Sequence, residues 1–326
     1  MLLDHLKRKK VMVTTSKAGV QRMSDQLRHQ ELNFDNVIIH SHFRHFEKSV
    51  QDSGLSIKLG HRGAEHYFFD GQKHTVRPGR YLVVNRHRAF DCFLKSEEPI
   101  EAFCIYLSKQ IVRDVVSALL STPAQCLDNP IYLRQPEPVF QEKVYRTEEN
   151  VLGHFLAQLR PILASGTPMD FEALYYTLAE KLIRSQIQIE QQIQRISSTR
   201  RDTREELYRR LSIARHYIMD NFRQEISLDE LAREAALSKF HLLRTYKEAF
   251  GTTPYRQVLD LRLQRAQRLL AKGWLMEEIA FDLGFSDRRS FTKAFKKAFG
   301  LAPSGFRENR STGNNFSSKQ QFQNEL

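Results

Sequence analysis

A helical pattern that occurs twice between Ser227 and Arg307 constrains the fold of this chain more than any other feature. The second copy follows the first by 48 to 49 positions. The matched pairs are Leu231 and Ile279, Ala232 and Ala280, Ser238 and Ser286, Leu242 and Phe291, Arg244 and Lys293, Tyr246 and Phe295, Phe250 and Phe299, Gly251 and Gly300, and Pro254 and Pro303. A short apolar helix, a tight turn and a second helix with basic outer residues describe a helix-turn-helix, whose second helix enters a groove of DNA. The pattern predicts an all-α DNA-binding domain over residues 205–308.

Short local signals place the helices of the first copy. An opening helix is expected over 212–222. Ser227 and Glu230 have the spacing of a capping box, and Ser238 is expected to cap the recognition helix, which Gly251 ends. The residues of this helix expected to face the core are Leu242, Tyr246 and Phe250.

A longer helix is expected to join the two copies, from Pro254 to Leu270. At roughly 1.5 Å per residue it spans about 25 Å, which suits two recognition helices about one DNA turn apart. Its predicted outward residues are Arg262, Arg265 and Arg268. The second recognition helix is expected over Asp287 to Phe299, with Phe291, Phe295 and Phe299 as its buried stripe.

Positive charge is concentrated in the doubled region. Residues 200–310 hold 23 Lys and Arg against 15 Asp and Glu, whereas the rest of the 326-residue chain holds 27 against 23. A basic domain is attracted to polyanions, although solvated helix faces can have the same composition.

The rest of the composition bears on compartment and cofactors. The three cysteines, Cys92, Cys104 and Cys126, lack the paired spacing of a disulfide framework or a zinc site. No apolar run is long enough for a membrane span or for the core of a signal peptide. We therefore expect a cytoplasmic protein without membrane contact and without a cofactor.

The first half of the chain has a β-rich texture after a polar, basic arm at 1–35. Short runs punctuated by turn residues predict a small antiparallel barrel or sandwich over 36–107. The predicted strands are 36–40, 55–59, 67–69, 80–84, 89–94 and 100–107. Helical periodicity over 108–196, in the stretches 109–120, 139–163 and 171–196, predicts a segment that either forms a dimer surface or packs on the barrel. Residues 197–204 are the expected linker, and 309–326 an expected disordered tail.

The spacing of the doubled region resembles that of the AraC/XylS family of transcription regulators. The matching residues are Ala232, Ser238, Leu242, Arg244, Tyr246, Lys247, Gly251, Pro254, Arg262, Ala266, Leu269, Leu270, Ile279, Ala280, Gly284, Phe285, Ser286, Phe291, Phe295, Lys296, Gly300, Pro303, Phe306 and Arg307. The resemblance covers about 100 residues. It implies a sequence-specific regulator of transcription that binds double-stranded DNA and activates through RNA polymerase. A homodimer, formed through the helices of 108–196, is also expected.

The resemblance also implies which residues contact DNA. The expected base contacts are Phe240, Leu243 and Arg244 in the first copy, and Arg289, Ser290 and Lys293 in the second. The expected phosphate contacts are Ser238, Lys239, Lys247, Lys296 and Lys297.

Three residues depart from the family pattern. Tyr246 replaces the usual Phe and adds a hydroxyl that needs a partner. Leu243 is apolar where a polar base reader is common, so it would contact a thymine methyl group. Leu275 stands at the N-cap of the second copy, where its lack of a side-chain acceptor weakens the start of the helix. We therefore expect the first copy to contribute more to specificity.

Residues 76–85 resemble the strand-turn-strand segment of the cupin-like sensing domains that precede many such DNA-binding domains. The expected fold is thus α+β, with an N-terminal cupin-like β-barrel and flanking helices before the all-α domain. Such a barrel can hold a small effector. The candidate lining residues are His42, His66, Tyr67, Tyr81 and Asn85.

Two other functions stay open. A metal-dependent cupin enzyme fused to a DNA-binding domain would use His and Glu ligands, but His61 and Glu65-His66 do not follow the order of a cupin metal signature. We therefore expect no metal site and no catalytic residue. The other possibility is a regulator that binds no small molecule and is controlled by its abundance.

Overall fold

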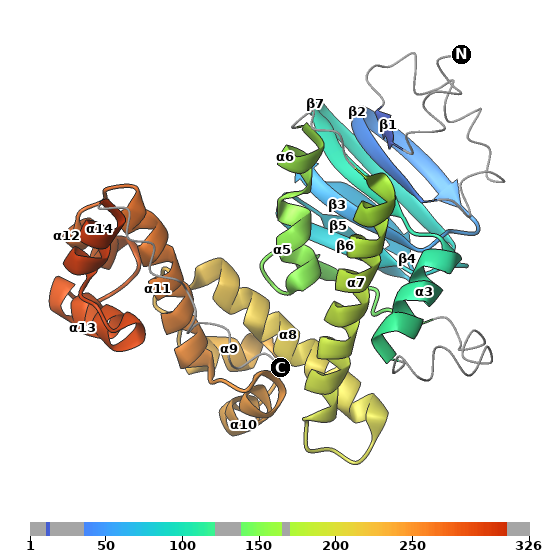
Figure 1. Cartoon of the computed structure of the whole chain (residues 1–326). Coiled ribbons are helices and arrows are strands. Elements are labelled where there is room, and N and C mark those ends of the chain that lie inside the picture. Colours follow the sequence, from blue (N-terminus) through green and yellow to red (C-terminus); the bar gives the residue numbers. More distant parts are fainter. Residues whose placement is uncertain (1–10, 14–35, 121–137, 165–169, 312–326) are drawn as a thin grey trace. The chain divides into compact units, whose positions relative to one another are not determined.

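The computed structural model describes residues 11–13, 36–120, 138–164 and 170–311 (Figure 1). The chain divides into two compact units, Met1–Ile189 and Glu190–Leu326, and the division lies inside the long helix α7 (Phe171–Gln194). The predicted linker 197–204 therefore belongs to the second unit. Within the described ranges, none of the helices has both the length and the apolar character that crossing a bilayer requires.

The first unit is built on an eight-stranded sheet, counted over the described residues, that curls into a nearly closed barrel. Its strands are β1 (Val11–Val13), β2 (Val37–Val50), β3 (Ser56–Arg62), β4 (Glu65–Phe69), β5 (Gln72–Val76), β6 (Arg80–Val84), β7 (Phe90–Tyr106) and β8 (Val144–Arg146). β7 is antiparallel to β2, β3 and β4, whereas β1 runs parallel to β2. The predicted cupin-like barrel is confirmed.

The strands are longer and more numerous than the sequence predicted. β2 continues ten residues beyond His40, and the runs 89–94 and 100–107 belong to the single strand β7. Of the polar stretch between those runs only Lys95 pairs with β2, where its partner is His45, and residues 96–99 form a bulge where the register shifts between Phe43 and His45. β5 was not predicted, and β1 lies inside the expected arm, whose other residues are outside the described ranges.

The helices of the first unit are α3 (Lys109–Leu120), α5 (Val151–Ala157), α6 (Leu159–Ala164) and the first part of α7; α5, α6 and α7 lie over one face of the sheet (Figure 1). The helix predicted over 139–163 is wrong in its first half, which contains β8. The Tyr145 ring is buried there and stacks on Tyr81 of β6 at 5.1 Å. Pairing with β6 thus outweighs the local helical periodicity.

The second unit is all-α in its described residues, as predicted. Beyond the end of α7 its helices are α8 (Arg201–Asn221), α9 (Leu228–Glu234), α10 (Lys239–Phe250), α11 (Pro254–Ala271), α12 (Met276–Asp282), α13 (Arg288–Phe299) and α14 (Pro303–Ser311). α8 begins at Arg201, well before the predicted start at 212, so part of the expected linker is helical. Buried Tyr208, whose hydroxyl donates to Gln192 at 2.9 Å, holds the early turns of α8 in place. Residues 312–326 of the expected tail lie outside the described ranges.

Candidate DNA-binding surface and barrel interior

The first helix-turn-helix has the caps that its sequence predicts. The Ser227 side chain accepts from the Glu230 N–H at 3.1 Å, and the Glu230 carboxylate accepts from the Ser227 N–H at 2.9 Å. The Ser238 hydroxyl accepts from the His241 N–H at 3.3 Å, and α10 ends at Gly251 with φ +69°. Both ends of α10 are therefore fixed, the start by the Ser238 cap and the end by Gly251.

Tyr246 anchors α10 to the core of this motif. It is fully buried, and its ring meets Phe250 edge-on at 4.7 Å. Its hydroxyl donates to the Gln257 side chain of α11, which supplies the partner that this departure from the family pattern requires. Burial raises the pKa of Tyr246 well above its ordinary value, so the hydroxyl stays a donor.

The opposite face of α10 carries the predicted base contacts. Phe240 is 90% exposed and Leu243 is 40% exposed, although both are apolar. The Arg244 side chain is 67% exposed, with Nε 3.7 Å from Glu248 Oε1. Lys239 lies beside Asp229 at 2.9 Å, and Lys247 is exposed in the last turn. These side chains form one open face that is available to a partner.

The second helix-turn-helix is centred on a set of Phe rings. Phe291 and Phe295 of α13 are fully buried, and Phe295 contacts Phe291, Phe299 and Phe306 with centroid distances of 4.5–5.7 Å. The predicted buried stripe is confirmed for Phe291 and Phe295, and Phe299 is half-buried against them. Arg289, Lys293, Lys296 and Lys297 are exposed on the other faces.

Ser290, a predicted base contact, is engaged in the N-cap of α13. Its N–H donates to the Asp287 carboxylate at 2.6 Å, and its hydroxyl donates to the Asp287 carbonyl at 2.8 Å. The hydrogen bond from the Ser290 N–H is the main cause of the lowered pKa of Asp287. A base contact by the Ser290 hydroxyl would therefore compete with its role at the start of the helix.

Leu275 is the N-cap of α12 and accepts no hydrogen bond through its side chain, as the sequence predicted. The Glu278 carboxylate still accepts from the Leu275 N–H at 3.0 Å.

Leu275→Ser should stabilise the second unit by about 1 kcal/mol, because a Ser hydroxyl can accept a hydrogen bond from an N–H of the first turn of α12. Denaturant unfolding followed by the fluorescence of Trp274, the single tryptophan, measures this. Leu275→Ala is the control without a hydroxyl, and an equal gain in both variants would contradict the capping explanation.

Arg262 joins the two helix-turn-helix units, a role that the sequence did not reveal. Its guanidinium donates to three backbone carbonyls: Nε to Phe222 at 2.7 Å, Nη1 to Gly284 at 2.6 Å and Nη2 to Gln224 at 2.8 Å. The prediction that Arg262 points outward is therefore wrong, because the segment after α8 returns to α11 at this point. Burial is also the largest cause of the lowered pKa of this group.

Gly284 allows this close approach. Its φ is +69°, and a Cβ there would lie 2.5 Å from the Arg223 carbonyl oxygen and 2.9 Å from Arg262 Nη2. No other residue type fits this backbone without displacing the turn that starts α13. The glycine is the signal in the sequence that marks the contact.

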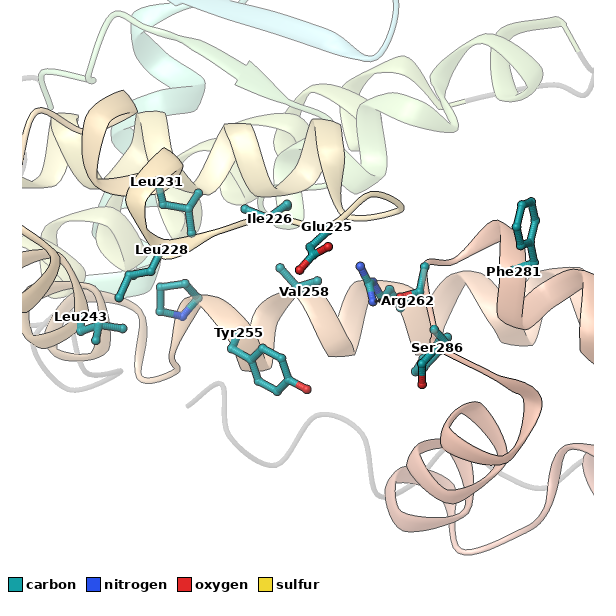
Figure 2. A pocket seen from close by; sticks show the side chains of 13 residues that line it. Glu225, Ile226, Leu228, Leu231, Leu243, Tyr255, Val258, Arg262, Phe281 and Ser286 are labelled. Carbon is teal, nitrogen blue, oxygen red and sulfur yellow. Dashed lines mark hydrogen bonds between the residues drawn. The ribbon is translucent and has the colours of Figure 1, made fainter.

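A groove of about 720 Å³ lies within the second unit, along α11 and between its two helix-turn-helix motifs. Figure 2 shows Leu243 at one end, Ser286 at the other and Tyr255 between them. Tyr255 is 79% exposed and was not singled out from the sequence. The predicted base-contact residue Leu243 and the turn before α13 thus border a single concave surface.

The five predicted effector-lining residues do not share one face of the barrel. Tyr67 lies in the core with Leu82 and Phe90, whereas Tyr81 donates to Asn150 at 2.9 Å, near the start of α5. His66 contacts the Thr75 hydroxyl at 3.1 Å, and His42 is exposed.

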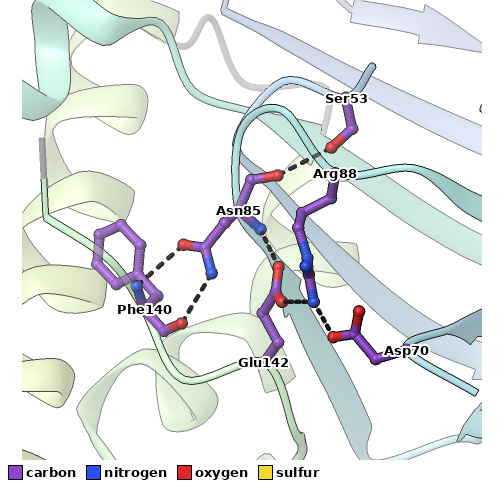
Figure 3. Close-up of polar contacts among 6 residues, drawn as sticks. All are labelled: Ser53, Asp70, Asn85, Arg88, Phe140 and Glu142. Atoms are coloured by element: carbon purple, nitrogen blue, oxygen red, sulfur yellow. Dashed lines mark hydrogen bonds and ion pairs between the residues drawn. The ribbon is translucent and has the colours of Figure 1, made fainter. Parts of the chain in front are cut away.

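Asn85 has a structural role at the edge of the barrel. Its side chain donates to the Phe140 carbonyl at 2.8 Å and accepts from the Phe140 N–H at 2.9 Å. The Asn85 N–H donates to Glu142, whose carboxylate also pairs with Arg88 at 2.8 Å (Figure 3). These bonds fix the extended segment that leads to β8.

Two histidines of the first unit, one of them the His61 considered as a metal ligand, lie beside a carboxylate. His40 Nε2 lies 2.7 Å from Glu101, His61 Nε2 lies 3.8 Å away, and Arg160 Nε lies 3.2 Å away. Burial alone would raise the pKa of Glu101, but these neighbours, the His40 hydrogen bond first, lower it below its ordinary value. The described residues contain no group of three or more His, Cys, Asp or Glu arranged to hold a metal ion. The cluster contains an ion pair between Arg160 and Glu101 and a hydrogen bond between His40 and Glu101.

Both units of the chain match known protein families. Residues 36–167 match the AraC-like ligand binding domain, and residues 231–309 match a helix-turn-helix domain, so that the two matches cover more than half of the chain. The transcriptional activator RhaS of Escherichia coli strain SE11 is 33% identical over 102 residues, which are 31% of this chain and 37% of that protein. RhaS of strain SMS-3-5 is 28% identical over 198 residues, which are 57% of this chain and 70% of that protein.

Comparison with solved structures gives matches to one or both units. The C-terminal domain of AraT, a response regulator from Geobacillus stearothermophilus, is 30% identical, covers 31% of this chain and 85% of its own, and has a TM-score of 0.30. ToxT from Vibrio cholerae is 13% identical, covers 85% of this chain and 98% of its own, and has a TM-score of 0.32. On the two domain matches, the chain belongs to the AraC family of transcription regulators.

Proposed function

We propose that α10 and α13 enter successive major grooves on one side of a DNA duplex and read its sequence. The observation that carries this proposal is that both helices bury one face around an aromatic side chain and leave a basic face open. A duplex bound by both helices passes over the groove along α11, where Tyr255 is exposed. The second unit then needs no second copy of itself to contact two grooves.

Within this surface we assign different roles to different side chains. Phe240, Leu243 and Arg244 of α10, with Arg289, Ser290 and Lys293 of α13, contact bases; Ser238, Lys239, Lys247, Lys296 and Lys297 contact phosphates. Leu243 supports an apolar contact with a thymine methyl group, because it is partly exposed on the same face as Arg244. The capping bonds of Ser290 and the missing side-chain cap at Leu275 favour α10 as the main determinant of specificity.

We further propose that the protein is a cytoplasmic homodimer that activates transcription through RNA polymerase and responds to a small effector in its barrel. The RhaS relatives are transcriptional activators, which supports activation, and the match to the AraC-like ligand binding domain supports an effector. Effector binding would shift the population of states in which the two recognition helices reach their DNA sites. Control by abundance alone is the alternative that an effector-independent protein would reveal.

Arg244→Ala should weaken binding to the specific DNA site, obtained by selection from random sequences, by about 1–3 kcal/mol. Binding to random DNA should be nearly unchanged, because a base contact contributes only at the correct sequence. Lys247→Ala is the matched comparison, since a lost phosphate contact weakens binding to both DNAs alike. Fluorescence anisotropy titrations with both DNAs at fixed salt measure these effects. Equal losses on both DNAs for Arg244→Ala would show that Arg244 contacts a phosphate.

A further inference from the structure

A polar cluster lies inside the barrel of the first unit. The pairing of β3 with β7 places Ser56 opposite Tyr106 and Lys58 opposite Cys104. Because side chains alternate along a strand, these four residues share one face, and Ile57 lies on the other. The same interior holds the apolar cluster of Tyr67, Phe69, Val76, Leu82, Val84, Phe90 and Cys92. Polar and apolar groups thus lie side by side in the barrel interior.

Lys58 is the centre of this cluster. The residue is 3% exposed, and its Nζ donates to Cys104 Sγ at 2.7 Å and to the Tyr106 hydroxyl at 3.3 Å. The rings of Tyr106, Phe90 and Tyr67 surround the ammonium group at 4.7, 5.4 and 6.0 Å. The faces of these three rings favour the charged ammonium form of the side chain in the interior.

The cluster has a surplus of hydrogen-bond donors. In the described part of the chain, no carboxylate lies within 4 Å of Lys58 Nζ. Burial raises the pKa of Tyr106 to about 12, so at neutral pH its hydroxyl is protonated and supplies no negative charge. The hydroxyl of fully buried Ser56 has no hydrogen-bond partner among the residues that the structure describes. The nearby Glu65 carboxyl accepts a hydrogen bond from the Tyr67 hydroxyl at 3.0 Å, and burial raises the pKa of Glu65.

We propose that Lys58, Tyr106 and Ser56 bind the carboxylate of a small organic acid, and that this acid is the effector of the regulator. A buried cation surrounded by donors is stabilised by an acceptor that brings the opposite charge, and a carboxylate provides both. The apolar cluster contacts the body of the acid, while partly exposed Cys104 and Tyr106 mark the side from which it enters. This inference rests on the proposed regulatory function and assigns the chemical class of its ligand.

The test compares acids with neutral molecules of the same shape. The full chain is titrated by calorimetry with acetate, butyrate, octanoate and benzoate, and with the four corresponding amides. At least one acid should bind about tenfold or more tightly than its amide, because only the acid pairs with Lys58. Lys58→Met should weaken that binding by about tenfold or more, and Ser56→Ala by a smaller factor.

Two controls keep the test interpretable. Lys95→Met removes an exposed lysine of β7 and should leave acid binding unchanged. Near-ultraviolet circular dichroism checks that Lys58→Met folds, and Ser56→Ala remains as the milder variant if it does not. If no acid binds more tightly than its amide, or if both interior variants bind the acids as the unaltered chain does, the inference is wrong. Sequence-specific DNA binding in the same preparations would show that the proposed regulatory function survives that failure.

Discussion

Gly284→Ala is expected to lower the free energy of unfolding of the second unit by about 2–4 kcal/mol. The residue adopts φ +69°, and its missing Cβ would lie 2.5 Å from the Arg223 carbonyl oxygen. Backbone strain and a clash with another backbone atom therefore add together, and neither can be relieved by a side-chain rotation. Urea unfolding followed by Trp274 fluorescence reports the change, because Trp274 lies between α11 and α12.

Gly300→Ala is the matched control for this prediction. Gly300 has φ +75°, but a Cβ at that position meets nothing within 4 Å. It should therefore show only the backbone cost, about 1 kcal/mol. Equal losses for the two variants would mean that the approach of Gly284 to Arg223 does not contribute.

Arg262→Met is expected to destabilise the second unit by about 2–4 kcal/mol and also to impair recognition of two DNA boxes. The substitution removes hydrogen bonds to three carbonyls, those of Phe222, Gln224 and Gly284, each donated by a charged group. These carbonyls belong to the segment before the first helix-turn-helix and to the turn of the second. Without these hydrogen bonds, the turn before α13 can move relative to α11.

Arg268→Met provides the control, because Arg268 is exposed on the same helix. It should change the unfolding midpoint little. DNA titrations with one-box and two-box sites, at a temperature where both variants are folded, separate a loss of stability from a change in the relative position of the two recognition helices. Arg262→Met should reduce the ratio by which the two-box site is bound more tightly than the one-box site, which is the advantage of the two-box site. An unchanged advantage would show that Arg262 stabilises the unit without setting the relation of its two halves.

Local signals made the second unit predictable. The capping pair Ser227 and Glu230, the cap Ser238 and the terminal Gly251 act within a few residues, so the sequence determines them without knowledge of the fold. The buried positions Tyr246 and Phe295 follow from helical periodicity for the same reason. The DNA contacts assigned to the exposed faces stay predictions.

Features that depend on distant segments could not be predicted. Periodicity placed Arg262 on an outward face but did not reveal that the end of α8 packs there. β8 forms because Tyr145 pairs with Tyr81, far away in the sequence. A strand residue faces inward or outward with nearly equal odds, so the interior position of Lys58 emerged only from the register of β3 and β7.

Selection of binding sites from random DNA with the full chain tests the central claim most directly. Two recognition helices joined by α11 should enrich a motif of two boxes about one helical turn apart. Mixing one-box and two-box sites in a competition titration then measures the contribution of the second box. A single enriched box, or no enriched sequence at moderate salt, would contradict the claim that both helix-turn-helix units read DNA.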